Sequence, residues 1–101
     1  MDPHLLKTAA PVFAALGDKT RLRLVIQLGT EGPLSITRLT AENQVTRQAV
    51  TKHLHVLARS GIAHSSKLGR ERIWELEPRA LLTVRDYLNQ ISAEWMKRWV
   101  A

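Results

Sequence analysis

The 101-residue chain has no cysteine, which excludes disulfides, thiolate nucleophiles and thiolate metal sites. It has no apolar run near the roughly 18–20 residues that cross a bilayer. Residues 1–4 lack the basic-then-apolar layout of a signal peptide. Internal repeats, low-complexity tracts and linkers are missing too. We therefore expect one soluble cytoplasmic domain spanning residues 1–101, with no membrane partner.

Catalytic signatures are also missing. No carboxylate pair, Ser/His/Asp arrangement or glycine-rich phosphate loop stands out. His53 and His55 stand at i and i+2, which do not share a helix face, so they cannot clamp one metal together. We expect His53 to pack or hydrogen-bond at the base of its helix, and His55 to face solvent or phosphate. The chain is therefore predicted to be no enzyme, with no cofactor and no metal.

What the chain does have is positive charge, concentrated in one segment. Its 15 Lys and Arg against 9 Asp and Glu give a net charge of +6, and 45% of its residues are hydrophobic, enough for a packed core. Residues 46–72 hold six basic residues and one acidic residue, a net of +5. A basic segment inside a folded domain favours a polyanionic partner.

Capping residues divide the first half of the chain into helices. Pro3 and Pro11 bracket a segment that is either a frayed arm or the start of a helix; Val12, Phe13 and Leu16 follow as one apolar face, and Gly17 ends it. Asp18 is a good N-cap for a second helix, which carries Leu22, Val25, Ile26 and Leu28 and is expected to end at Gly29. Ser35 can cap a short third helix, Ile36–Glu42.

The second half is predicted as a helix, a hairpin and a long helix. Thr46 caps Arg47–Arg59, whose Val50, Leu54 and Leu57 form one inward stripe, and Gly61 ends it. Residues 62–68 and Glu71–Leu76 read as two strands around a basic tip. Pro78 can open the final helix. The fold class is therefore mainly α with a small β-hairpin, in the order α-α-α-α-β-β-α.

Ile36–Glu42, a short turn and Arg47–Arg59 describe a helix-turn-helix, with the hairpin as a wing. The cap at Thr46 directs first-turn amides and the positive dipole end toward phosphate, while Arg47 and Gln48 can reach guanine and adenine edges. The wing is expected to contact backbone or minor groove. The candidate contacts with double-stranded DNA are Thr46, Arg47, Gln48, Thr51, Lys52, His55, Lys67, Arg70 and Arg72.

Three segments in this order resemble ArsR-type (ArsR/SmtB) winged helix-turn-helix repressors. Residues 13–24 (FAALGDKTRLRL) resemble the opening signature of that family, residues 50–57 (VTKHLHVL) with 60–62 its recognition helix and exit, and residues 67–70 with 74–76 its wing. The resemblance covers about residues 10–99. It implies a homodimer packed through the first and last helices, with recognition helices in successive major grooves of a palindromic operator. It also implies repression that is relieved when an inducer binds or a partner acts.

The final helix carries the expected dimer seam. Leu81, Val84, Leu88, Ile91 and Trp95 follow 3-4-3-4 spacing, as in a coiled coil, and Trp99 lies four residues further on. Trp95 and Trp99 are expected to fill this seam, and Trp74 to pack the wing onto the body, in preference to lining an effector pocket.

The chain departs from the metal-sensing members of that family. Ser35 and Thr37 stand where those members carry a Cys-x-Cys pair, and the last helix has Glu77, Asp86 and Glu94 but no histidine. We therefore expect neither metal site. A small-molecule or protein effector, or no effector at all, stays open.

The sequence leaves two further questions: whether the partner is DNA or a protein, and what Arg21 and Arg23 do. A winged helix can instead bind a protein, but such a face would expose more apolar or aromatic side chains than Arg47–Arg59 offers. Arg21 and Arg23 either touch phosphates or form local salt bridges, and the sequence does not separate these roles.

Overall fold

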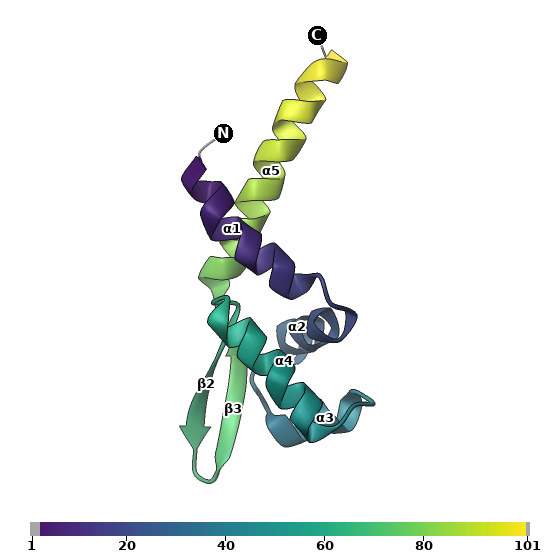
Figure 1. Cartoon of the computed structure of the whole chain (residues 1–101), viewed down its shortest axis with the longest axis vertical. Coiled ribbons are helices and arrows are strands. Elements are labelled where there is room, and N and C mark those ends of the chain that lie inside the picture. Colours follow the sequence, from purple (N-terminus) through teal and green to yellow (C-terminus); the bar gives the residue numbers. More distant parts are fainter. Residues whose placement is uncertain (1–2, 101) are drawn as a thin grey trace.

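A computed structural model describes residues 3–100; Met1, Asp2 and Ala101, which the expected domain includes, lie outside the described residues. Figure 1 shows a helical body with a hairpin at one end and two long helices at the other. The elements are α1 (Pro3–Leu16), α2 (Lys19–Glu31), β1 (Leu34–Ser35), α3 (Ile36–Glu42), α4 (Arg47–Arg59), β2 (Ala63–Leu68), β3 (Glu71–Leu76) and α5 (Pro78–Val100). The predicted class, mainly helical with a hairpin wing, is confirmed.

Helix starts follow the predicted caps. The Asp18 carboxylate accepts a hydrogen bond from the Arg21 N–H at 3.0 Å, and the Ser35 hydroxyl accepts one from the Arg38 N–H at 3.2 Å. The Thr46 hydroxyl accepts one from the Ala49 N–H at 3.1 Å. Each cap satisfies one of the backbone donors that a helix leaves unpaired in its first turn. The N-terminal segment is helical and contains Pro11, which settles the alternative that the sequence left open.

One hydrophobic core holds the helix-turn-helix to the rest of the body. The inward stripe of α4 is confirmed, since Val50, Leu54 and Leu57 have no exposed surface. Leu24 of α2, Leu39 of α3 and Ile62, which precedes the wing, are equally buried in the same cluster. The face of α4 opposite this stripe is thereby fixed toward solvent.

The sheet has three antiparallel strands in the order β1-β3-β2. Trp74 of β3 lies at its centre, paired with Leu34 on one side and Ser65 on the other, and only 4% of it is exposed. This inward position confirms the packing role expected for Trp74. The hairpin turns at Gly69, whose φ of 65° lies in the left-handed region that glycine tolerates best.

The expectations for α2 were partly wrong. The helix continues through Gly29 to Glu31 and ends at Gly32, which has a φ of 86° and whose N–H donates to the Leu28 carbonyl. A side chain at Gly29 would meet Leu76, because α2 packs against β3. Leu22 and Ile26 are exposed, and Leu24, Val25 and Leu28 supply the buried face.

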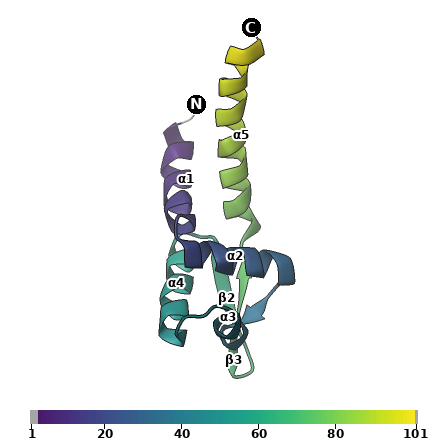
Figure 2. The ribbon, with the colours of Figure 1, turned by 90° about the vertical axis from the view of Figure 1, so that its right-hand side faces the viewer.

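Helices α1 and α5 run side by side beyond the body, as both views show (Figures 1 and 2). The Phe13 and Tyr87 rings meet between them, with centroids 5.9 Å apart. The chain measures 57 × 24 × 20 Å because α5 extends well past α1. Among residues 3–100, no helix combines the length and apolarity required to cross a membrane.

Candidate nucleic-acid interface

Asn43 fixes the turn between α3 and α4. Its side-chain N–H groups donate to the Gln27 side-chain carbonyl at 2.8 Å and to the Leu39 backbone carbonyl at 2.7 Å, and only 5% of the residue is exposed. The turn is therefore tied to α2 and α3 at once. The sequence places Asn43 in the short turn before Thr46, and no local pattern there marks its hydrogen bond to Gln27.

Replacing Asn43 by alanine is expected to lower the free energy of unfolding by about 1–3 kcal/mol, because two acceptors lose their buried donor. Chemical denaturation monitored by circular dichroism measures this loss. The neighbouring Gln44 is exposed, so Gln44→Ala is the matched control and should change the value by less than about 0.5 kcal/mol. Equal effects of the two substitutions would contradict the role given to Asn43.

The outer face of α4 is polar and basic. Arg47, Gln48 and Lys52 are exposed, and with Thr51 they line a shallow hollow of about 430 Å³. The Thr51 hydroxyl donates to the Arg47 backbone carbonyl at 2.8 Å. Arg47 and Gln48 lie in the first turn, beside amides that carry the positive end of the helix dipole. This is the arrangement that suits contact with phosphates and base edges.

The wing holds its basic residues together. Lys67 and Arg72 are direct cross-strand partners, and Arg72 also donates to the Ser65 hydroxyl at 2.9 Å. Like charges in direct opposition destabilise a hairpin, so a polyanion beside them would relieve the repulsion. Arg70 lies exposed in the turn itself.

The wing tip and the N-terminal end of α4 occupy the same end of the molecule, away from both termini (Figures 1 and 2). Thr46, Arg47, Gln48, Lys52, Lys67, Arg70 and Arg72 are all exposed there or along the adjoining strands. His55 is also exposed, with its ring centroid 6.4 Å from that of Trp74. Glu71 is the one acidic residue within residues 46–72. Helix α4 and the wing can therefore contact one extended anion together.

His53 belongs to an internal network behind this face. An Arg21 guanidinium nitrogen lies 3.3 Å from His53 Nδ1, and Arg21 Nε donates to the Ala15 carbonyl at 2.6 Å. The Arg21 backbone N–H holds the pKa of Asp18 below its ordinary value of 3.8, and the charges of Arg21 and His53 act in the same direction against desolvation. His53 thus hydrogen-bonds as expected, and Arg21 has a local role. Arg23 is exposed, and its alternative stays open.

The expected seam divides into two parts along α5. Leu81 and Val84 are partly buried within the chain, and Val84 packs against the core. Leu88, Ile91, Trp95 and Trp99 are 48, 42, 57 and 70% exposed. The Trp95 and Trp99 rings meet edge to face, with centroids 6.0 Å apart. The part of α5 beyond the body therefore presents an uncovered apolar stripe.

Residues 3–100 bring no group of three or more His, Asp or Glu side chains together in a way that could hold a metal ion. Ser35, at one position where metal sensors carry cysteine, uses its hydroxyl to cap α3.

A helix-turn-helix with a free basic face, followed by a basic hairpin, defines a winged helix-turn-helix protein. A helix-turn-helix domain family matches residues 16–65. An HTH-type transcriptional regulator of Mycobacterium tuberculosis is 33% identical over 78 residues, which cover 77% of this chain and 72% of that protein.

Solved structures agree. An ArsR-like transcriptional regulator from Rhodococcus sp. RHA1 is 36% identical with a TM-score of 0.79, over 92% of this chain and 87% of that chain. A homodimeric winged helix-turn-helix DNA-binding domain from Mycobacterium bovis shares the fold at 18% identity and a TM-score of 0.72, over 90% of this chain and 82% of that chain. The chain belongs to the ArsR family of winged helix-turn-helix transcriptional regulators. It is accordingly a DNA-binding regulator of transcription.

Proposed function

We propose that this chain is a homodimeric repressor, one domain over residues 1–101, that binds a palindromic operator through α4 and the wing. The observation that carries the proposal is the joint placement of Arg47 and Gln48, at the capped start of α4, with the basic wing at the same end of the molecule. In this arrangement α4 reads bases in the major groove, and the wing binds the phosphate backbone. Such a regulator acts in the cytoplasm, where its operator lies.

A two-fold symmetric dimer is what would match a palindromic operator. The apolar stripe of α5, beginning at Leu88 and Ile91, is exposed, and no other part of residues 3–100 covers it. A two-fold axis along this stripe would bury it and direct two α4 helices toward successive major grooves. The homodimeric domain from Mycobacterium bovis with the same fold supports this assembly.

Substitutions in α4 and in the wing are expected to have different consequences. Arg47→Ala or Gln48→Ala should cost about 1–3 kcal/mol of operator binding and relax the preference at one base position. Arg70→Ala should weaken binding to all sequences about equally and reduce the slope of log affinity against log salt by about 1. Fluorescence anisotropy with operator and scrambled duplexes at several salt concentrations measures both effects.

Arg79 is exposed at the start of α5, outside both DNA-facing elements. Arg79→Ala therefore removes one positive charge as a matched control and should leave both the preference and the salt slope unchanged. If the α4 and wing variants all behaved like this control, the proposed mode of binding would be wrong.

A further inference from the structure

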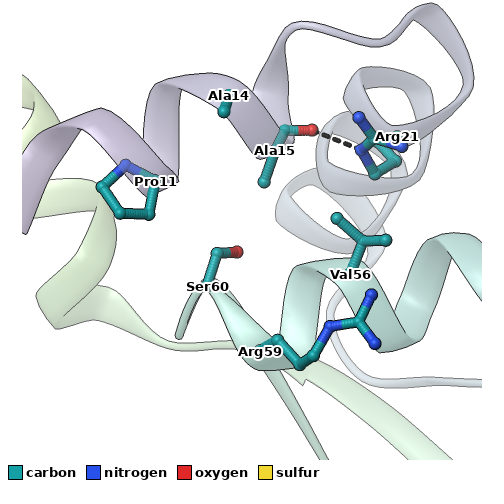
Figure 3. Close-up of a pocket in the computed structure, with 7 residues that line it drawn as sticks. All are labelled: Pro11, Ala14, Ala15, Arg21, Val56, Arg59 and Ser60. Carbon is teal, nitrogen blue, oxygen red and sulfur yellow. Dashed lines mark hydrogen bonds between the residues drawn. The ribbon is translucent and has the colours of Figure 1, made fainter.

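A second hollow lies at the other end of α4, between that helix, α1 and α2 (Figure 3). It is open to solvent and has a volume of about 360 Å³, within the range of small-molecule sites. Its walls are mostly apolar and small, formed by Pro11, Ala14 and Ala15 of α1 and by Val56 of α4. The narrow side chains of α1 leave the room, since Ala14 and Ala15 end at Cβ.

Two guanidinium groups lie at the end of this hollow away from Pro11 (Figure 3). Arg59 is exposed, and no acidic side chain among residues 3–100 pairs with it. Arg21 Nε donates to the Ala15 carbonyl, and one terminal nitrogen of Arg21 lies within hydrogen-bond distance of His53. These two contacts hold the guanidinium in place. The nearest carboxylate of this network, Asp18, accepts from the Arg21 backbone and is not in the lining.

We propose that this hollow is a binding site for a small carboxylate with an apolar body, such as an aromatic or medium-chain acid. Guanidinium groups match a carboxylate with two parallel hydrogen bonds. The apolar walls reward burial of a hydrocarbon body, which inorganic phosphate does not have. The Ser60 hydroxyl, also in the lining, already donates to the Leu57 backbone carbonyl at 3.0 Å, so the two guanidinium groups are the donors for the carboxylate.

The position of the site suits regulation. Helix α1 packs on α5 and α2, whereas α4 packs on α2, α3 and β2. Arg21 joins Ala15 of α1 to His53 of α4. A ligand bound by Arg21 and Arg59 would therefore affect the angle between α1 and α4. Arg59 stands about 18 Å along α4 from Arg47, from a rise of 1.5 Å per residue, so ligand and DNA need not compete. This consequence rests on the proposed operator binding; the ligand site itself does not.

Isothermal titration of the full chain, without DNA, with benzoate and octanoate tests the site. Both carboxylates should bind, and benzamide and octanamide should bind at least about tenfold more weakly, because a charge-assisted pair is lost. Arg59→Gln should weaken carboxylate binding by a similar factor. Ala14→Phe, at an exposed position, should fill the hollow and abolish binding. Arg23→Gln, an exposed arginine of α2 outside the hollow, is the matched control and should bind as the parent does.

Three results would overturn the proposal. The first is no binding of either carboxylate up to millimolar concentrations. The second is unchanged binding in both the Arg59 and the Ala14 variants, which would place the ligand elsewhere. The third is binding of inorganic phosphate as tight as that of the carboxylates, which would mean a bare anion site without a role for the apolar walls. Because DNA is absent throughout, failure of operator binding would not produce any of these results.

Discussion

Replacing Ile91 by glutamate is expected to convert the protein to monomers and weaken operator binding by at least about 100-fold, the scale of avidity lost when two linked sites separate. Ile91 lies within the exposed apolar stripe of α5, between Leu88 and Trp95. A carboxylate there would have to be desolvated opposite its own symmetry mate, which is strongly unfavourable. Sedimentation velocity gives the oligomeric state, and anisotropy gives the operator affinity.

Gln90→Glu is the matched control for this substitution. Gln90 is exposed, adjacent in sequence and off the 3-4-3-4 stripe, so the same added charge should leave the dimer intact. The Ile91 variant should keep its helical content, because this part of α5 lies outside the core cluster. A dimer that persists in Ile91→Glu would contradict the seam assigned to α5.

Replacing Trp74 by alanine is expected to lower the free energy of unfolding by about 3–5 kcal/mol, the usual cost of removing a buried tryptophan. Trp74 is the central residue of the sheet, joins β1 to β2 and contacts His55 of α4. Its loss should therefore loosen the wing and the face of α4 together. At a fixed protein concentration, the melting temperature should fall by at least about 12 °C, from 4–8 °C per kcal/mol in a domain of this size.

Trp74→Phe separates the two properties of this side chain. The indole Nε1–H is buried without a hydrogen-bond acceptor among the described residues, and an unpaired buried donor carries a desolvation cost. Phenylalanine keeps an aromatic ring and removes that donor, so it should lose less than half of what alanine loses. If phenylalanine were as destabilising as alanine, burial of the aromatic ring would not be the source of the stability assigned to Trp74.

Local signals were sufficient for most of the body. Asp18, Ser35 and Thr46 each cap the predicted helix because their hydroxyl or carboxylate oxygens reach a first-turn amide. The stripe from Val50 to Leu57 is buried because 3.6 residues per turn places these positions on one face. The two strands on either side of Gly69 could be predicted from the turn residue and the strand pattern alone. The outward basic face of α4 then followed from the inward one.

Features that depend on tertiary contacts could not be predicted from the sequence. Gly29 looked like a helix end, but it lies inside α2, where the helix packs against β3 and a Cβ at Gly29 would be in ordinary contact with Leu76. The two-residue strand β1 is too short for any periodicity, and it exists because β3 offers a free edge to Leu34 and Ser35. The bonds from Asn43 to Gln27 and from Arg21 to His53 join residues 16 and 32 positions apart. No local pattern in the chain marks either pair.

Selection of bound duplexes from a random DNA pool measures whether a dimer of this chain reads its operator through α4. We expect enrichment of a palindrome whose half-sites are centred about one helical turn, roughly 10 base pairs, apart. Arg47→Ala should enrich the same palindrome with relaxed preference at one symmetric position. No enriched sequence, or a single half-site without its symmetric partner, would contradict a dimer that reads its operator through α4.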